Sequence, residues 1–247
     1  DSLRLALMSF SSPDSDKNWD NKVFYGSHKF LKSLYNFAIN YNFKENKEES
    51  SPLISHKINK AVKEINRDLE NFDYNLAIIK LRKLYESFSQ EEKDISKEDL
   101  EKFLKMLAPF APHISEELWE KIGNNKNKKN FISKEEWPEA DETKIDERLE
   151  KKEQAIEKIT DDINNIVKLI QEKQPKKEKP SKAIIYTIPP EKENYSSSIE
   201  KIKKKTHLEE VEVYAINDQA IKSNPEKTDP EGKAKKAKPG KPAIYLE

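Results

Sequence analysis

The chain has 247 residues, and 46 Lys and Arg residues balance 46 Asp and Glu residues, so its formal net charge is zero. Its mean hydropathy of −0.98 and its 37% content of charged residues make it polar for a globular chain. The absence of cysteine excludes disulfide bonds, a thiol nucleophile and cysteine-bound zinc. No run approaches the roughly 20 apolar residues of a membrane span, and no signal peptide precedes the first helix. We therefore expect a cytoplasmic protein and, because Asp1 replaces a starting Met, a piece of a larger polypeptide.

The neutral total conceals an uneven distribution of charge along the chain. Residues 173–247 contain 17 lysines and 12 acidic residues, a net charge of +5, so residues 1–172 carry −5. A basic tail on an acidic body indicates more about binding partners than the overall charge does.

Helical periodicity dominates the first three quarters of the chain, where apolar residues recur at three- and four-residue steps. Pro52 suits a first helical turn, Gly123 suits a helix C-terminus, and Ser96 with Asp99 has the spacing of a capping box. The stretch 71–74 fits either a tight turn or a continuous helix, and its Phe-Asp step favours the turn. The helices predicted in this way cover about residues 1–10, 20–42, 52–72, 74–88, 96–107, 112–122 and 146–172. We predict an antiparallel helical bundle over residues 1–172, with a loop at 123–145.

The pattern changes at a Pro/Lys-rich linker, residues 173–181. Beyond it, β-branched and aromatic runs predict strands at 183–188, 211–216 and 242–247, with a charged helix at about 192–206 between the first two. Residues 182–247 are thus predicted to form a small α/β module. The fold class is mainly α, a helical bundle followed by this module.

The residues that usually build active sites are sparse. Four glycines do not form a phosphate-binding loop, and none of the four histidines lies three or four residues from another, which excludes a metal-binding helical pair. His113 fits a capping or packed imidazole, and Glu116 and Glu117 suit a first helical turn. We expect no catalytic, cofactor or metal site in this chain.

Lysine clusters in the C-terminal module are more informative. One comprises Lys201, Lys203, Lys204 and Lys205; the other comprises Lys233, Lys235, Lys236, Lys238 and Lys241. Basic runs are often only solvated surface, but both clusters lie in the module that carries the positive excess. That module also supplies tyrosines that could stack on bases: Tyr186, Tyr195, Tyr214 and Tyr245. Of these, Tyr186 and Tyr214 fit strand packing better, and the whole pattern favours RNA binding.

The segment 107–119 reads Leu-Ala-Pro-Phe-Ala-Pro-His-Ile-Ser-Glu-Glu-Leu-Trp. It resembles the anticodon-binding helical bundle of the class I aminoacyl-tRNA synthetases for leucine, isoleucine, valine and methionine. The opening Asp1–Leu5 and the pair Trp137-Pro138 fit the same group, so the resemblance covers about residues 1–145. The ending, residues 229–247, is similar to that of archaeal-type leucyl-tRNA synthetases.

This resemblance implies a division of labour within a larger enzyme. Leucine would be joined to ATP and then to tRNA on a catalytic domain whose signature sequences are absent here, so this chain alone should be non-catalytic. ATP and Mg²⁺ are expected to serve that absent domain. The implied partner of the bundle and module is tRNA-Leu, with the module at its long variable arm and the last residues at the tip of that arm. The implied tRNA-binding residues are Lys201, Lys203, Lys204, Lys205, Lys235, Lys236, Lys238, Lys241, Tyr245, Leu246 and Glu247.

Three alternatives stay open at this point. The bundle could belong to an isoleucyl, valyl or methionyl enzyme. The chain could be a separately encoded, non-catalytic tRNA-binding subunit that joins the catalytic and editing domains in trans. It could also be a helical scaffold with an incidental basic tail.

Overall fold

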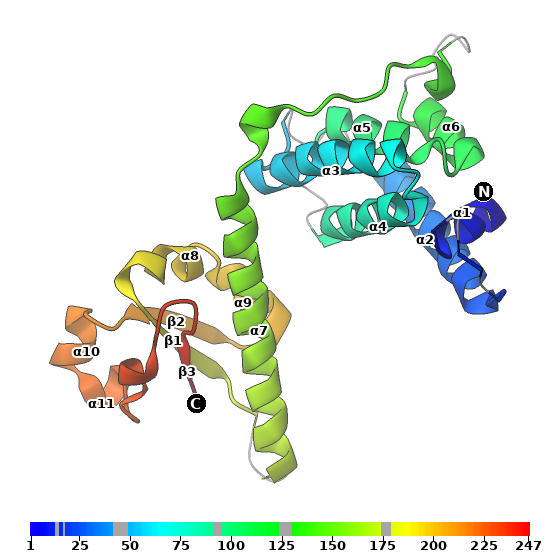
Figure 1. Ribbon diagram of the computed structural model, residues 1–247. Helices are drawn as coiled ribbons and strands as arrows, with labels where there is room; N and C mark the ends of the chain where they lie inside the picture. The colour runs from blue at the N-terminus through cyan, green and yellow to red at the C-terminus, as the bar shows by residue number, and fades with distance from the viewer. Residues whose placement is uncertain (13–14, 17, 42–48, 91–94, 124–129, 174–178) are drawn as a thin grey trace. The chain divides into compact units, whose positions relative to one another are not determined.

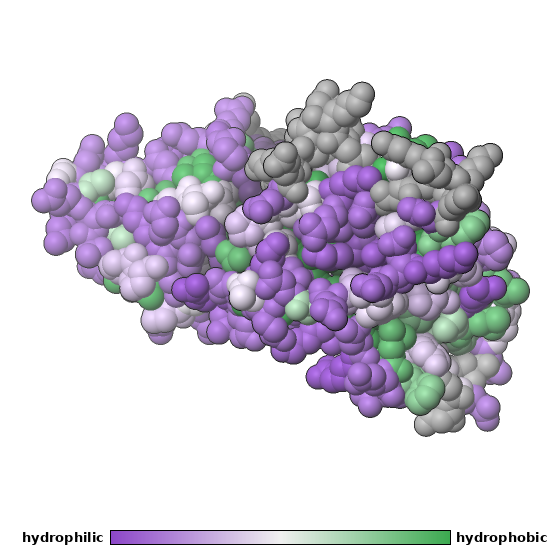
Figure 2. Space-filling model, turned by 90° about the horizontal axis from the view of Figure 1, so that it is seen from above, coloured by the Kyte–Doolittle hydropathy of each residue, from purple (hydrophilic) through white to green (hydrophobic). Residues whose placement is uncertain are grey.

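The computed structural model describes residues 1–12, 15–16, 18–41, 49–90, 95–123, 130–173 and 179–247. The chain divides into two compact units, Asp1–Leu149 and Glu150–Glu247. Within the described part, no helix is both long and apolar enough to cross a membrane. On the face drawn in Figure 2, hydrophilic residues cover most of the surface, in keeping with the low mean hydropathy.

The first unit is a bundle of helices around one apolar core (Figure 1). Its helices are α1 (Ser2–Ser9), α2 (Asn21–Asn40), α3 (Pro52–Glu70), α4 (Tyr74–Gln90), α5 (Lys97–Leu107) and α6 (Pro112–Lys121), followed by the 3-10 turns η2 (Ile132–Lys134) and η3 (Glu142–Lys144). The apolar stripes seen in the sequence supply the core, in which Leu34, Ile58, Leu81 and Phe103 are fully buried. The predicted loop at 123–145 therefore contains two short turns, and its residues 124–129 lie outside the described residues.

The predicted helix ends are found where the sequence placed them. Pro52 occupies the first turn of α3, and the hydroxyl of Ser96 accepts a hydrogen bond from the amide of Asp99 at 3.2 Å. Gly123 has a φ of +94°, which suits a residue just past a helix. Residues 71–73 form the favoured turn between α3 and α4, with Phe72 at a φ of +60°.

The second unit contains a three-stranded sheet in the order β2-β1-β3. Strand β1 (Lys182–Thr187) pairs in parallel with β2 (Glu210–Ala215) and antiparallel with β3 (Ala243–Leu246). The crossover between β1 and β2 carries η4 (Pro189–Glu191), α8 (Lys192–Ser196) and α9 (Ile199–Thr206). The connection from β2 to β3 carries α10 (Gln219–Ser223), α11 (Pro225–Thr228) and η5 (Lys233–Lys236).

Each face of the sheet has its own apolar cluster, because successive strand residues point to opposite sides. On one face, Ala183 and Ile185 of β1 pack with Ile202 of α9 and with the long helix α7 (Glu147–Lys173). On the other face, Ile184 and Tyr186 pack with Ala234 of η5. We call these the α7 face and the η5 face.

The domain boundary is a correction to the sequence prediction, which placed helix 146–172 in the bundle. From Glu150 onward α7 belongs to the second unit, since Ile156, Ile159 and Ile163 are buried against the sheet. With the boundary at 150, the second unit contains 21 lysines and 18 acidic residues. The net charge of this unit, residues 150–247, is therefore +3, lower than the +5 of residues 173–247 alone, because the added part of α7 is acidic. Within the predicted linker 173–181, residues 174–178 lie outside the described residues.

Two further details differ from the predicted elements. The helix expected over 192–206 is interrupted at Ser197 and Ser198, where the hydroxyl of Ser197 donates to the carbonyl of Glu193 at 2.6 Å. The region expected as a loop before the last strand contains α10, α11 and η5. The predicted fold class, a helical bundle followed by a small α/β module, is confirmed.

Candidate nucleic-acid interface

The first lysine cluster lies on α9, where acidic residues compensate most of its charge. The ammonium of Lys201 lies 3.9 Å from Glu153, and that of Lys205 lies 3.9 Å from Glu157. Both glutamates belong to α7, which packs beside α9 on the same face of the sheet. Lys203 lies 3.9 Å from Glu200, one turn earlier in its own helix. Lys204 is exposed.

The second lysine cluster lies on η5 and on the hairpin that follows it. Lys235, Lys236, Lys238 and Lys241 are all exposed, and among the described residues no carboxylate lies within 4 Å of their ammonium groups. Only Lys233, at the start of η5, has a partner, Glu231 at 2.9 Å. We call residues 232–241 the lysine loop.

Two acidic side chains hold the lysine loop in shape at its two ends. The carboxylate of Asp229 accepts hydrogen bonds from the amides of Lys233 at 2.6 Å and Ala234 at 3.2 Å, so it caps η5. Lys238 and Lys241 exchange backbone hydrogen bonds of 3.0 and 2.9 Å around Pro239 and Gly240. Gly240 has the positive φ, +66°, that a type II turn requires at this position. Its amide donates to Glu191 at 2.9 Å.

These two acids were not among the residues singled out from the sequence. The signal for Asp229 is present, because Asp-Pro-Glu-Gly is typical of a turn in which an Asp side chain bonds to nearby amides. The role of Glu191 depends on a tertiary contact across 49 residues, for which the sequence offers no local signal.

The two lysine clusters lie on opposite faces of the sheet. Helix α9 packs on the α7 face through Ile202, whereas η5 packs on the η5 face through Ala234. They therefore do not form one continuous basic surface.

The last three residues also divide between the two faces. Leu246 packs with the apolar cluster of the α7 face, whereas Tyr245 lies half-buried on the η5 face. The ammonium of Lys233 lies 5.2 Å from the centre of the Tyr245 ring, a cation–π contact. Glu247 is exposed, and its carbonyl accepts hydrogen bonds from the amides of Ser181 at 2.8 Å and Lys182 at 3.1 Å. The structure thus brings Tyr245 to Lys233 at the start of the lysine loop, and places Glu247 at the other end of β3 from the turn at Pro239 and Gly240, while Leu246 lies on the opposite face of the sheet.

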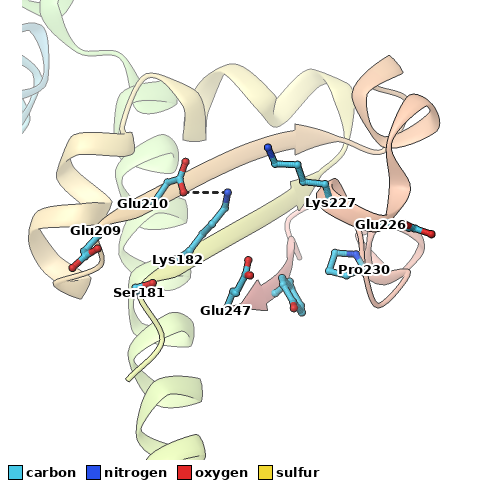
Figure 3. A pocket seen from close by; sticks show the side chains of 9 residues that line it. Ser181, Lys182, Glu209, Glu210, Glu226, Lys227, Pro230 and Glu247 are labelled. Carbon is cyan, nitrogen blue, oxygen red and sulfur yellow. Dashed lines mark ion pairs between the residues drawn. The ribbon is translucent and has the colours of Figure 1, made fainter. Parts of the chain in front are cut away.

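Beside the lysine loop, the η5 face contains an open hollow of about 590 Å³ (Figure 3). Its ionisable side chains come from β1, the start of β2, α11 and the chain end, and Figure 3 draws them around the hollow. They are Lys182, Lys227, Glu209, Glu210, Glu226 and Glu247. Tyr245 and Pro230 complete much of the lining. Four carboxylates against two ammonium groups make the hollow acidic, while the adjoining loop is basic.

A charge network connects Lys182 and Glu210, which line this hollow, with Glu212 on the same sheet. Lys182 of β1 donates to Glu212 at 2.6 Å and lies 3.1 Å from Glu210, the pair marked in Figure 3. Burial lowers the pKa of Lys182, but the hydrogen bonds and charges of the two glutamates outweigh burial and raise it. The pKa of Glu212 lies below its ordinary value. Burial acts to raise this pKa, but the hydrogen bonds from Lys182 and Tyr214 have the larger combined effect. Lys182 is thus held in place and charged.

The other tyrosines are structural, as predicted for two of them. Tyr186 is fully buried, its hydroxyl donates to the carbonyl of Thr228 at 2.7 Å, and burial raises its pKa. Tyr195 is 2% exposed, and burial raises its pKa to about 12. Tyr214 lies on the sheet, where its hydroxyl donates to Glu212 at 3.0 Å. Tyr245 is therefore the tyrosine that combines partial exposure with proximity to the lysine loop.

Histidines and acids of the bundle have structural partners. His113 contacts the carboxylate of Asp1 at 2.9 Å, and Glu116 accepts a hydrogen bond from the amide of Ile132 at 3.1 Å. Within the described part of the chain, no group of three or more His, Asp or Glu side chains could hold a metal ion.

Comparison with known proteins gives one family and a consistent group of relatives. The family model described as "Anticodon-binding domain of tRNA ligase" matches residues 52–186, more than half of the chain. A leucine–tRNA ligase of Prochlorococcus marinus subsp. pastoris is 35% identical over an alignment that covers 66% of this chain and 20% of the length of the ligase. A leucine–tRNA ligase of Pyrococcus horikoshii is 28% identical over an alignment that covers 100% of this chain and 31% of the length of that ligase. This chain therefore spans between a fifth and a third of the length of these relatives.

A solved structure was also found, that of a ternary complex of Agrobacterium radiobacter K84 agnB2 LeuRS with tRNA and LeuAMS. The match covers 87% of this chain and 28% of the matched chain, with 16% sequence identity and a TM-score of 0.46.

Proposed function

The chain belongs to the family of anticodon-binding domains of tRNA ligases, and on that premise we propose that it holds tRNA-Leu as one part of a leucine–tRNA ligase. The observation that carries this proposal is the lysine loop. It carries four exposed lysines without a carboxylate partner among the described residues, and its first lysine, Lys233, contacts the ring of Tyr245. Such ammonium groups bind phosphates and set the register of a nucleic acid.

The acidic hollow complements the lysine loop. Phosphates are disfavoured among Glu209, Glu210 and Glu247, but carboxylates accept hydrogen bonds from the amino groups of bases. We propose that the lysine loop grips the backbone of the long variable arm while an unpaired base of that arm enters the hollow. Tyr245 offers it a ring face, and Glu247 offers it an acceptor.

The relatives support leucine specificity and an archaeal-type C-terminal module. The Prochlorococcus ligase matches 66% of the chain, whereas the ligase of the archaeon Pyrococcus horikoshii matches all of it, including the module. In this proposal, the bundle docks near the inner corner and anticodon stem of the tRNA, and leucine activation takes place on a catalytic domain outside this chain. ATP and Mg²⁺ serve that domain, the catalytic and editing domains are the protein partners, and the enzyme works in the cytoplasm.

Two affinities of the purified chain test the proposal. Fluorescence anisotropy with labelled transcripts measures the Kd for tRNA-Leu and for a tRNA with a short variable arm. We expect tRNA-Leu to bind at least about tenfold more tightly, a difference of about 1.4 kcal/mol. In a parallel assay of leucine-dependent ATP–pyrophosphate exchange, the chain alone should be inactive.

The double replacement Tyr245→Leu with Glu247→Gln provides the matched control. It removes the proposed ring face and the proposed side-chain acceptor while the pairing of β3 with β1 is kept, so we expect loss of the preference for tRNA-Leu with most of the affinity retained. Equal affinity of the intact chain for both tRNAs, or pyrophosphate exchange by the chain alone, would contradict the proposal.

A further inference from the structure

The lysine loop is bonded to carboxylates near both of its ends, although carboxylates repel the phosphates that it is proposed to bind. At the start of the loop, the two oxygens of Asp229 accept hydrogen bonds from the amides of Lys233 and Ala234. At its turn, one oxygen of Glu191 accepts from the amide of Gly240. A negative charge beside a phosphate-binding surface weakens the attraction of that surface, so these two acids need a compensating role.

Both acids bond to the backbone and leave the lysine charges free. Within the described part of the chain, neither carboxylate lies within 4 Å of a lysine ammonium group. The second oxygen of Glu191 accepts from the hydroxyl of Thr187 at 3.3 Å, while Asp229 uses its two oxygens on the amides of η5. The acids therefore shape the backbone of the loop without neutralising the side chains that it presents.

The two acids are themselves held by neighbouring residues of the central strand. Tyr186 of β1 is fully buried, and its hydroxyl donates to the carbonyl of Thr228, the residue before Asp229. Thr187, the next residue of β1, is also fully buried and donates to Glu191. Because β1 lies between the other two strands, both ends of the lysine loop are connected through one acid each to the centre of the sheet.

We propose that Asp229 and Glu191 are positioning residues, which hold the lysine loop in the conformation in which its ammonium groups bind RNA phosphates. This rests on the proposed function. Gly232 and Gly240 have positive φ angles, and glycine has the most backbone freedom to lose on ordering. A loop that is ordered before it binds loses less conformational entropy on binding, and this gain offsets the repulsion between the acids and the phosphates.

Replacement of Glu191 by glutamine and by alanine separates positioning from charge. Both replacements remove the same negative charge, but only glutamine keeps an oxygen that accepts from the Gly240 amide. Charge alone predicts that both variants bind RNA equally and more tightly than the unaltered chain. We expect Glu191→Gln to bind at least as tightly as the unaltered chain, and Glu191→Ala to bind about fivefold or more weakly than Glu191→Gln. Fluorescence anisotropy of the complete chain with labelled tRNA-Leu measures these affinities.

Glu193 provides the matched control. It is exposed, it lies two residues further along the chain, and its carboxylate makes no hydrogen bond or ion pair with the described residues. Glu193→Gln and Glu193→Ala should therefore bind equally. Asp229 provides a second pair, since asparagine keeps one acceptor oxygen and alanine keeps none. We expect Asp229→Ala to bind more weakly than Asp229→Asn. If Asp229→Ala does not fold, the Glu191 pair decides.

A double-mutant cycle excludes a general effect on the fold. The Glu191 pair is repeated in a chain in which Lys235, Lys236, Lys238 and Lys241 are all alanine. If Glu191 acts through the lysine loop, the difference between glutamine and alanine should vanish in this background. Hydrogen exchange of the β1 amides, which reports the sheet, should be the same in both variants. Equal affinities of the original Glu191 pair, or a difference that persists without the four lysines, would overturn the proposal.

A tRNA with a short variable arm separates this proposal from the proposed function. Phosphate contacts carry no sequence information, so Glu191→Ala should weaken the binding of both tRNAs by the same factor. If the intact chain prefers tRNA-Leu but the Glu191 pair binds it equally, positioning alone is overturned. If the intact chain has no preference but the Glu191 pair still differs, the proposed function fails and positioning stands. Binding of neither tRNA would overturn both.

Discussion

Replacing Lys235, Lys236, Lys238 and Lys241 together by alanine should weaken tRNA-Leu binding and make it less dependent on salt. These side chains are exposed and lie apart from carboxylates within the described structure, so each can neutralise a phosphate without first leaving a protein partner. Their removal should also leave the fold intact, since η5 is held through Ala234 and Asp229 rather than through the lysines.

The size of the effect follows from counterion release. Each phosphate contact contributes about 0.7–0.9 to the slope of log affinity against log salt concentration, so four contacts contribute about 3. Between about 50 and 200 mM salt, the affinity advantage of the unaltered chain over the variant should therefore shrink roughly 60-fold. Fluorescence anisotropy with labelled tRNA-Leu over this range measures both slopes.

The lysines of α9 are the matched control. Lys201, Lys203 and Lys205 lie near Glu153, Glu200 and Glu157, so a phosphate must compete with those carboxylates. Replacing these three lysines by alanine should change the slope by clearly less per residue than the loop replacement does. If the slope of log affinity against log salt concentration is unchanged in the variant of the lysine loop, the loop does not bind phosphates. If the slope changes equally per lysine in both variants, pairing with carboxylates does not decide which lysines bind tRNA.

Three other predictions concern the second unit. Ile163→Ala removes a fully buried side chain of α7 and should lower the unfolding free energy of the sheet unit by about 2–4 kcal/mol. Leu169→Ala, at an exposed position of the same helix, should change this free energy by less than about 0.5 kcal/mol. Equal effects of the two replacements in thermal melts would contradict the assignment of α7 to the sheet unit. Glu191→Ala should speed hydrogen exchange of the Gly240 amide without loss of the sheet, and an unchanged rate would exclude that anchor. Glu212→Gln should cost about 1 kcal/mol or less after solvent screening. Because its folded-state pKa is lowered, this cost should be present above the ordinary glutamate pKa of about 4.3 and vanish as the pH falls through the lowered value. A cost that persists in acid would argue against the ion pair.

Helices of the bundle could be predicted closely because their signals are local. The apolar spacing and the caps at Pro52, Ser96 and Gly123 each depend on a few neighbouring residues. The same spacing identified α7 as a helix with one apolar face. It could not identify what covers that face, because Ile156 and Ile163 would suit a helical bundle as well as a sheet.

Local signals were also insufficient for the C-terminal site. Strand alternation predicts that Tyr245 and Leu246 point to opposite faces, and the structure places them so. The hollow beside Tyr245 brings together side chains from residue 181 to residue 247. No motif joins these positions, so the hollow could be found only from the folded chain.

The charge of a lysine run becomes informative only when its tertiary partners are known. Lys201 and Lys205 look as available in the sequence as Lys235 and Lys236, and all four contribute equally to net charge. Helix α7 approaches α9 with glutamates about 48 residues earlier in the chain, whereas among the described residues no carboxylate lies within 4 Å of the ammonium groups of Lys235 and Lys236. The same fold that compensates the lysine charge on α9 leaves that of Lys235 and Lys236 uncompensated. It is therefore the lysine loop, rather than α9 or the acidic hollow, where we expect a polyanion to bind.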